Sequence, residues 1–252
     1  MGSFGGVTLT DLSTPVFWFG VVSIILIDLV LSGDNAVLIA MACRNLPKEL
    51  QAKGILFGTL GAIGLRVIFA TLAVTLLNIP FLKAIGGLIL VWIAIKLMSE
   101  VDSEQEDIAA PDRLWAAVKT IIVADAVMSL DNIIAIAGAA QGKVALLWFG
   151  LLVSIPLVVF GSRILVVLMN KFSWIIALGA GILGWTAGHM LITDIKILQY
   201  FGNFLKLPFM LNGQLISLFL AAAVIVAGIF IKKERMRIKV VRTKKDIATK
   251  RC

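Results

Sequence analysis

The sequence predicts an all-α polytopic membrane protein with seven transmembrane helices, arranged as two inverted three-helix repeats and one C-terminal helix. Three observations lead to this prediction. Of the 252 residues, 60% are hydrophobic and 15% are charged, and the mean hydropathy is +1.02. The apolar residues gather in long stretches, and one polar motif occurs twice inside these stretches. Ordinary soluble domains have a much smaller apolar share.

Seven apolar stretches are long enough, at roughly 20 residues each, to cross a hydrocarbon core of about 30 Å. The third stretch is short, and the sixth is rich in glycine. The predicted spans are 16–41, 54–77, 82–97, 114–137, 145–168, 174–192 and 215–231.

The polar motif Asp-x-x-x-Ser-x-Asp-Asn occurs in the first predicted span as DLVLSGDNA and in the fourth as DAVMSLDNI. The two copies start 97 residues apart, and the same offset carries Arg66 onto Arg163. After a four-residue shift, AIGGLILVW from Ala84 aligns with ALGAGILGW from Ala177. The chain is therefore predicted to contain two repeats of three helices each.

Because three is an odd number of spans, the second repeat must enter the membrane from the opposite face. The repeats are then inverted about an axis in the membrane plane, an architecture common among transporters, whose binding sites lie near the midplane. The predicted division is a first repeat (1–98), an acidic cytoplasmic linker (99–113), a second repeat (114–193), an extracytoplasmic loop with the seventh helix (194–231) and a basic cytoplasmic tail (232–252).

The orientation follows from the lysines and arginines. The tail holds 10 of the 23 basic residues, and the predicted inside and outside segments together hold 16 and 4. This bias predicts a cytoplasmic C-terminus and an extracytoplasmic N-terminus. We expect a multi-pass protein of the cell membrane, without a cleaved signal peptide and without a nucleic-acid partner, whose tail binds anionic lipid.

Aspartates inside a membrane span cost about 2.5–3.5 kcal/mol each and normally mark an ion path, a proton relay or an ion pair. Two arginines offset only part of the charge of four aspartates, and one divalent cation would neutralise the rest. We therefore expect one cation site built from both motif copies, although a purely structural pairing of aspartates with arginines is the alternative. The predicted ligands are Asp28, Asp34, Asn35, Asp125, Asp131 and Asn132; Ser32 and Ser129 are additional candidates, and Arg66 and Arg163 form the ion pair or gate.

The state of the motif helices is left open. On a regular helix, positions 28, 32 and 35 share one stripe, whereas Asp34 points away from it. A broken helix would let all the oxygens converge and would free backbone carbonyls. Gly33 loosens the first copy, but the second copy has Leu130 at the same place.

Carboxylate, amide and hydroxyl oxygens suit the hard divalent cations Ca²⁺, Mg²⁺ and Mn²⁺. Cys43 lies at the end of the first predicted span, Cys252 ends the chain, and His189 is the single histidine. This composition argues against Zn²⁺ and Cu⁺, and we interpret His189 as a structural polar residue. The transported ion is the expected ligand, and no organic cofactor is expected.

The duplicated motif in the first and fourth of seven spans resembles the TerC family of integral membrane proteins, within the lysine exporter superfamily. The resemblance extends to about residue 231. It implies export of manganese from the bacterial cytoplasm, linked in some members to metal loading of secreted enzymes, so that secretion or metalloenzyme-assembly proteins are candidate partners. The family's acidic motif residues match the six predicted ligands without substitution.

The functional hypothesis is secondary transport of Mn²⁺, with proton exchange as the expected coupling and no enzymatic activity. Transport of another cation such as Ca²⁺ is one alternative, and a membrane scaffold or assembly factor is another. An intramembrane aspartyl protease would also use two membrane aspartates. That class resembles a Tyr-Asp plus Gly-x-Gly-Asp pattern, which neither Ser32-Gly33-Asp34 nor Ser129-Leu130-Asp131 matches. The oligomeric state is not predicted.

Overall fold

The computed structural model describes the backbone of residues 14–31, 33–72, 76, 79–100, 109–140, 144–201 and 209–250. The side chains of residues 16, 27–31, 131–140, 144–147, 149, 201, 209–212 and 239–250 lie outside this description. Within the described residues the secondary structure is entirely helical. The helices are α1 (Pro15–Leu31), α2 (Gly33–Cys43), α3 (Lys48–Thr71), α5 (Leu82–Ser99), α6 (Ala110–Ala140), α7 (Val144–Lys171), α8 (Trp174–Ile192), α9 (Ile195–Phe201) and α10 (Phe209–Lys250).

Five helices of the described chain are long and apolar enough to cross a membrane. They correspond to the second, third, fifth, sixth and seventh predicted spans, and 174–192 coincides with α8. Helix α3 begins and ends six residues before the predicted 54–77. Hydropathy misses its first turns because Lys48, Glu49 and Lys53 lie there. The total of seven spans stays a prediction.

The first predicted span, 16–41, is described as helix over α1 and α2, and residue 32 between them lies outside the described residues. A Cβ atom added to Gly33 would meet no other atom within 4 Å, so packing does not require glycine there. The fourth predicted span lies inside α6, whose 31 residues continue through the second motif copy without interruption. The backbone of the second motif copy is therefore described as continuous helix, whereas the first copy contains residue 32, which lies outside the described residues.

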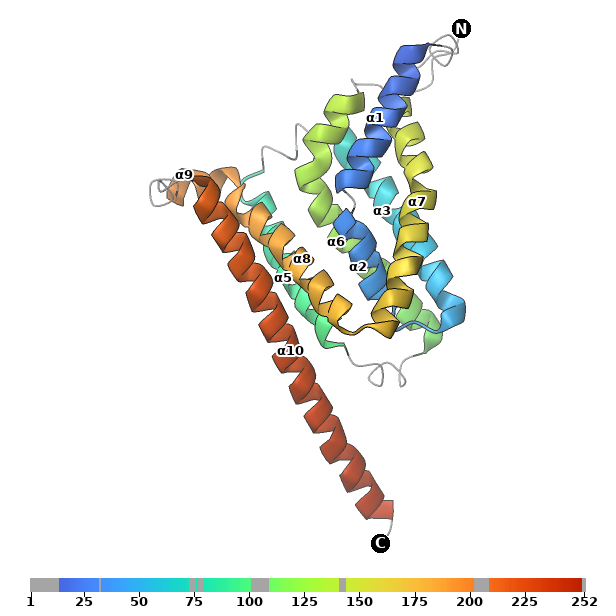
Figure 1. Ribbon diagram of the computed structural model, residues 1–252, viewed down its shortest axis with the longest axis vertical. Coiled ribbons are helices and arrows are strands. Elements are labelled where there is room, and N and C mark those ends of the chain that lie inside the picture. Colours follow the sequence, from blue (N-terminus) through green and yellow to red (C-terminus); the bar gives the residue numbers. More distant parts are fainter. Residues whose placement is uncertain are drawn as a thin grey trace.

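The helices form two groups, as Figure 1 shows. In one group, α8 packs against both α5 and α10; in the other, α3 packs against α6 and α7, and α1 and α2 pack against α7. The first helical segment of each predicted repeat thus contacts the second helix of the other repeat, and the third helices, α5 and α8, contact each other. Contacts of α6 with α5 and of α2 with α8 join the groups.

Glycines allow the helices of the smaller group to approach closely. A Cβ on Gly87 of α5 would lie 2.8 Å from the carbonyl oxygen of Ala187, and one on Gly188 of α8 would lie 2.5 Å from the Cα of Ser217. Because these neighbours are backbone atoms, any larger residue would force the helices apart. Small residues at such contacts are typical of helix packing in membranes, where no hydrophobic force favours association.

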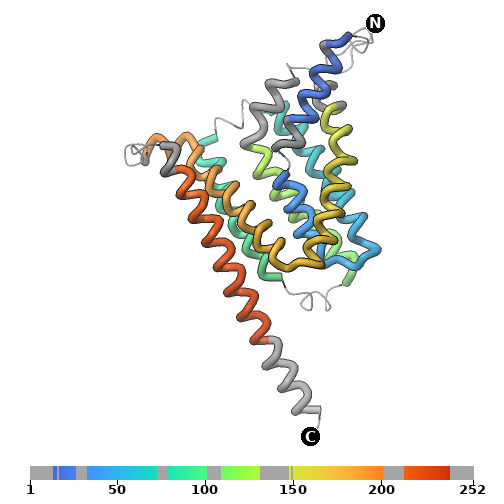
Figure 2. The backbone as a smooth tube through the Cα atoms, in the orientation of Figure 1, coloured from blue at the N-terminus to red at the C-terminus, as the bar shows by residue number. Residues whose placement is uncertain are grey.

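Helix α10 extends well beyond the other helices (Figure 2). Its 42 residues are about 63 Å long at 1.5 Å per residue, twice the thickness of a hydrocarbon core. The predicted boundary between a seventh span and a tail at residue 232 is therefore not a break in the helix. Phe219, Val226 and Phe230 are largely exposed on α10, as expected of side chains that face lipid.

Candidate cation site

An ion pair joins α3 to α6 in the interior of the larger helix group. Nη2 of Arg66 lies 2.7 Å from Oδ1 of Asp125, and both residues are only 3% exposed. Burying two charges is unfavourable unless they pair closely and their remaining polar atoms are also satisfied. The pair links the second helix of the first predicted repeat to the motif of the second.

Ser129 completes this arrangement. Its hydroxyl donates a hydrogen bond to Oδ2 of Asp125 over 3.2 Å and accepts one from Nε of Arg66 over 3.3 Å. Asp125 and Ser129 share a face of α6 because they are four residues apart on a regular helix. Both carboxylate oxygens of Asp125 are thereby engaged.

Asp34 is the second residue of α2. Its Oδ1 accepts a hydrogen bond from the backbone N–H of Asn35 over 3.0 Å, and its Oδ2 accepts one from the hydroxyl of Thr186 over 3.2 Å. Thr186 belongs to α8, so this contact crosses between the two helix groups.

The sequence analysis did not identify Thr186. In the alignment of AIGGLILVW with ALGAGILGW, Trp92 matches Trp185, and Thr186 therefore matches Ile93. A search for duplicated polar residues cannot find a position that is polar in only one copy.

A small cavity separates the polar groups of α2, α3 and α6. Its volume is about 20 Å³, and its polar lining residues are Asn35, Thr59, Arg66 and Asp125. This is room for about one water molecule or one small ion. The hydroxyl of Thr59 is buried in the cavity wall and has no hydrogen-bond partner among the described residues. Thr59 was also not predicted, although it lies two helical turns before Arg66 on the same face.

The described residues therefore bring together Asn35, Arg66, Asp125 and Ser129, while Asp34, the neighbour of Asn35 in the chain, contacts Thr186. Arg163 does not join them, because its side chain is exposed on the face of α7 that also carries Phe160 and Val167. It forms no ion pair with another described residue. The backbones of Asp28, Asp131 and Asn132 lie in α1 and α6, but their side chains, and Ser32 as a whole, lie outside the described part of the chain.

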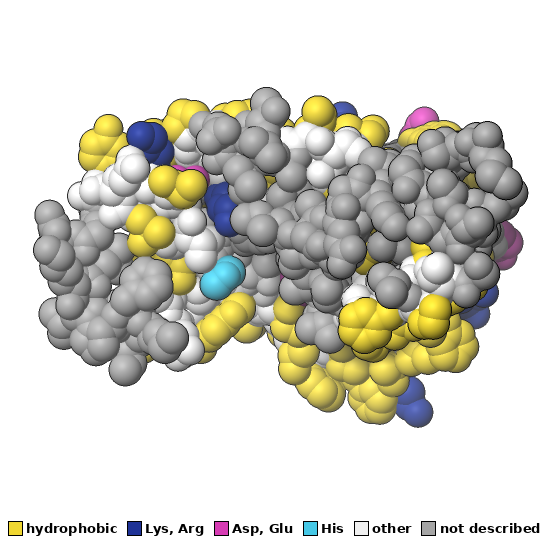
Figure 3. Space-filling model, turned by 90° about the horizontal axis from the view of Figure 1, so that it is seen from above, with side chains coloured by type: hydrophobic (Ala, Val, Ile, Leu, Met, Phe, Trp, Pro, Cys, Tyr) yellow, Lys and Arg dark blue, Asp and Glu magenta, His cyan; other side chains and the backbone are white. Residues whose placement is uncertain are grey.

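The described residues contain no cluster of three or more His, Cys, Asp or Glu side chains that could hold a metal ion. His189 is exposed at the surface, where histidine is coloured cyan in Figure 3, and Cys43 is buried as a free thiol. Neither residue contacts the cavity beside Asp125. Its polar lining consists of hydroxyl, amide and carboxylate oxygens and one guanidinium group.

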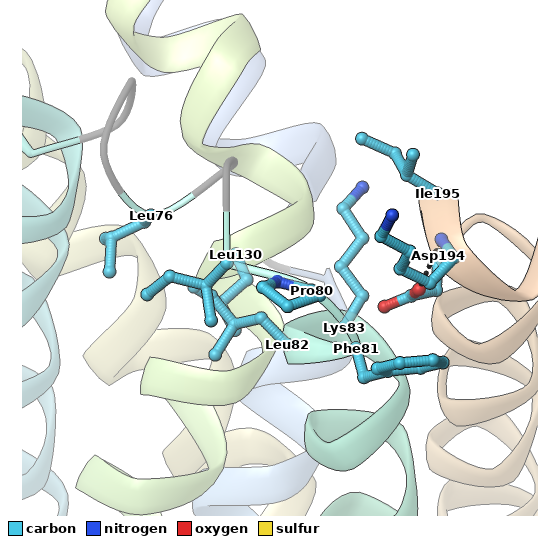
Figure 4. Close-up of a pocket in the computed structure, with 10 residues that line it drawn as sticks. Leu76, Pro80, Phe81, Leu82, Lys83, Leu130, Asp194 and Ile195 are labelled. Carbon is cyan, nitrogen blue, oxygen red and sulfur yellow. Dashed lines mark hydrogen bonds between the residues drawn. The ribbon is translucent and has the colours of Figure 1, made fainter.

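A larger cavity of about 230 Å³ opens next to the second motif copy (Figure 4). Leu130 of α6, the residue before Asp131, lines it together with Lys83 of α5 and Asp194, which precedes α9. Asp194 is 3% exposed and accepts hydrogen bonds from the backbone N–H groups of Ala84 and Lys196 over 3.1 and 2.9 Å. These bonds fix the start of α5 against the start of α9 and hold the cavity open.

Chemically, the small cavity offers hard oxygen atoms and one fixed positive charge. Asp125, its carboxylate, is neutralised by Arg66, and the carboxylate of Asp34, beside Asn35 in the chain but not in the cavity lining, is oriented by neutral donors. Such a site suits one hard cation when Arg66 moves away from Asp125, and it suits a proton or water when Arg66 remains there.

Comparison with known proteins places the chain among integral membrane proteins. The family model described as the integral membrane protein TerC family matches residues 13–236. The chain is 42% identical over 171 residues to a Bacillus subtilis (strain 168) protein described as "Uncharacterized membrane protein YjbE", covering 68% of this chain and 78% of that protein. It is 30% identical over 175 residues to "Uncharacterized membrane protein YceF" of the same organism, covering 66% of each.

A more distant relative is the UPF0053 protein YegH of Escherichia coli (strain K12), 25% identical over 186 residues. The match covers 66% of this chain but 35% of that protein, so the chain spans about a third of the length of YegH. No solved structure matches the fold significantly. Because the family model covers nearly all of the chain, including both motif copies, four of the five candidate spans and all but the last two residues of the fifth, the protein belongs to the TerC family of integral membrane proteins.

Proposed function

We propose that this protein is a secondary transporter that exports a divalent cation, with Mn²⁺ as the substrate, from the cytoplasm. One observation carries the proposal: Asn35 of the first motif copy and Asp125 of the second line the same buried cavity within a bundle of membrane helices. A carboxylate in such a place is costly unless it serves an ion path, a relay or an ion pair. Membership of the TerC family supports a membrane transporter.

In this proposal Arg66 acts as an internal counter-ion. Its guanidinium neutralises Asp125 while no cation is bound. A divalent cation arriving beside Asp34 and Asn35 competes for Asp125, and Arg66 moves away. The site then stays near charge balance in both states, which avoids a buried unpaired charge.

The packing of the helices supports an inverted-repeat transporter. Helix α3 packs on α6, while α1 and α2 pack on α7, which is the reciprocal contact expected when two repeats are related by a two-fold axis.

The proposed orientation has the N-terminus outside and the basic end of α10 in the cytoplasm. The cavity lined by Leu130, Lys83 and Asp194 is then the extracytoplasmic exit, and proton exchange would use the same carboxylates. Cysteines introduced at Thr8 and Asp246, in a variant without the native cysteines, test the orientation with an impermeant reagent. Labelling of position 246 in intact cells would place the C-terminal end outside and overturn the proposed orientation.

A membrane scaffold or assembly factor is the second candidate. It is favoured by the complete pairing of Arg66, Asp125 and Ser129, which a purely structural role would explain.

The deciding experiment measures metal efflux from proteoliposomes loaded in turn with Mn²⁺, Ca²⁺, Mg²⁺ and Zn²⁺. We expect efflux of Mn²⁺, which Asp34→Asn abolishes while the protein still inserts. Asp112→Asn, an exposed change on α6, is the matched control and should leave efflux unchanged. Efflux of Ca²⁺ alone would make Ca²⁺ the substrate in place of Mn²⁺. The absence of efflux of any of the four cations would favour the scaffold.

A further inference from the structure

A second polar cavity lies at the end of the bundle where α5 ends and α6 begins. Its volume is about 250 Å³, and α5, α6 and α10 form most of its wall. The charged lining residues are Lys96 and Glu100 at the end of α5, Arg113 at the start of α6, and Arg235 of α10. It shares no lining residue with the candidate cation site.

Positive charge predominates in this cavity, since three cationic side chains face one carboxyl group. The carboxyl group of Glu100 accepts a long hydrogen bond of 3.5 Å from Asn45, and its burial raises its pKa, against the opposing effect of Lys96, Arg44 and Arg235. The cations outnumber Glu100 in either protonation state. An anion is therefore the complementary ligand.

The wall of the cavity is held in place by Arg44, which is only 6% exposed. Its Nη2 donates hydrogen bonds to the backbone carbonyls of Leu97, over 2.9 Å, and Glu100, over 3.4 Å. These bonds fix the last turn of α5 against the loop after α2. The cavity is thus part of the packed structure and not a gap between loose surface side chains.

Arg113 carries the most specific signal. Its Nε atom is buried and has no hydrogen-bond acceptor among the described residues. A buried donor without an acceptor is unfavourable, and such a group usually indicates an unobserved water or ion. The planar guanidinium group of arginine matches the geometry of phosphate, to which it can donate two parallel bonds.

The cavity lies at the level of a membrane surface. Lys96 lies in the last turn of the candidate span Leu82–Ser99, and Arg235 lies near the end of the candidate span Gly213–Ile238. Lipid phosphates lie at this level, and basic pockets between transmembrane helices bind anionic headgroups there. The volume is below the roughly 300–1,000 Å³ of sites for drug-sized ligands, so it suits a compact anion.

We propose that this cavity binds a phosphate group, supplied by an anionic lipid headgroup or by free phosphate. The proposal is independent of cation transport, because it uses none of the motif residues. It would attach α5, α6 and α10 to one ligand at the membrane surface.

The test uses the purified full chain in a neutral detergent, titrated with phosphatidylglycerol in mixed micelles, with diacylglycerol as the phosphate-free lipid, and separately with inorganic phosphate. Binding is followed by calorimetry. We expect Lys96→Gln and Arg113→Gln each to weaken phosphate-group binding about fivefold, the effect of roughly one basic contact. Lys119→Gln, an exposed change on α6, is the matched control and should bind like the wild type.

The two sources are distinguished by the titrations: binding of phosphatidylglycerol alone indicates a lipid headgroup, and binding of inorganic phosphate with the same variant pattern indicates free phosphate. Arg113→Lys keeps the charge but loses the Nε donor and the planar pair of donors, so it should bind more weakly than the wild type and more tightly than Arg113→Gln. Residual binding of this intermediate size separates ligand loss from misfolding. Acidic residues of the linker are unchanged in all variants and cannot cause a difference between them. Equal binding by the wild type and both Gln variants, or equal binding of diacylglycerol, would overturn the proposal.

Discussion

The hydroxyl of Thr186 in α8 donates a hydrogen bond of 3.2 Å to Oδ2 of Asp34 in α2, and so connects the two groups of helices at the first motif copy. Asp34 receives its other bond from the backbone of Asn35, its neighbour in the chain. Thr186 is therefore the described side chain that orients this carboxylate from another helix. A substitution at Thr186 should therefore change the affinity of the cation site without changing the charge of the site.

Thr186→Val keeps the shape of the side chain and removes the donor. If Asp34 binds the cation, we expect the apparent affinity for Mn²⁺ in efflux assays to fall by about 10–100-fold, as when a partner that orients a metal ligand is lost. Thr186→Ser keeps the hydroxyl and should behave nearly as the wild type. An unchanged affinity in Thr186→Val would remove Asp34 from the ligand set.

The close contact of α8 with α10 should depend on the absence of a side chain at Gly188. Gly188→Ala places a Cβ against the backbone of Ser217, and we expect it to lower the free energy of unfolding by about 1–3 kcal/mol. Gly161→Ala in α7 is the matched control, because its Cβ would meet no atom within 4 Å.

Since alanine favours helices over glycine by up to about 1 kcal/mol, Gly161→Ala should raise the stability. Thermal unfolding of both variants in detergent gives the comparison. A loss of stability of similar size in both would show that the contact of Gly188 with Ser217 is not tight in solution.

Hydropathy predicted most of the helices because a membrane span must be apolar over a fixed length. The predicted 174–192 coincides with α8, and 82–97 ends two residues short of α5. Whether the motif helices are broken was left open, since Gly33 allows a break without requiring one. The second copy lies in a continuous helix, and the first copy stays a prediction because residue 32 lies outside the described residues.

The pairing within the site could be predicted only in part. The repeat identified Asp125 and Arg66, but it made Arg66 and Arg163 equivalent, whereas Arg66 is buried against Asp125 and Arg163 is exposed. The two copies of a duplicated motif look equivalent in the sequence. The sequence therefore cannot indicate where equivalent residues have different surroundings in the folded molecule. For the same reason Thr59 and Thr186, which are polar in a single copy, were missed.

Glu100 should make the stability depend on pH. Burial raises its pKa above the ordinary value of 4.5, and Lys96, Arg44 and Arg235 oppose this shift. Folding therefore favours the protonated form: the wild type is most stable below the ordinary pKa and loses stability as the pH rises through the raised pKa. Glu100→Gln removes this dependence.

The variant and the wild type should unfold at similar temperatures near pH 4, and the variant should unfold at the higher temperature at pH 7–8. Melting curves across this range test the prediction. A parallel pH profile in both proteins would show that Glu100 does not titrate in the folded protein above its ordinary range.

The ion pair between Arg66 and Asp125 separates the two functional candidates. Asp125→Asn strands a guanidinium group that is 3% exposed, and breaking such a buried pair costs about 3–5 kcal/mol. The double variant Asp125→Asn with Arg66→Gln removes both charges, so its abundance in the membrane should recover towards the wild type. The stabilities of these variants should therefore be the same whether the pair is structural or belongs to a cation site, so stability alone does not distinguish the two roles.

Metal efflux distinguishes the two roles. The double variant restores the charge balance of the interior but still lacks the carboxylate of Asp125, so a cation site that needs this ligand stays inactive. We expect the double variant to be abundant yet unable to export Mn²⁺, since the substituted amide would supply a weaker, uncharged oxygen. Arg66→Gln alone should bind Mn²⁺ more tightly than the wild type, because no guanidinium group competes for Asp125. The rate of Mn²⁺ efflux and the affinity for Mn²⁺ are both measured on one set of proteoliposomes, with Asp112→Asn as the control. Recovery of efflux in the double variant would make the pair structural and would leave Asp34 as the described carboxylate available to a cation.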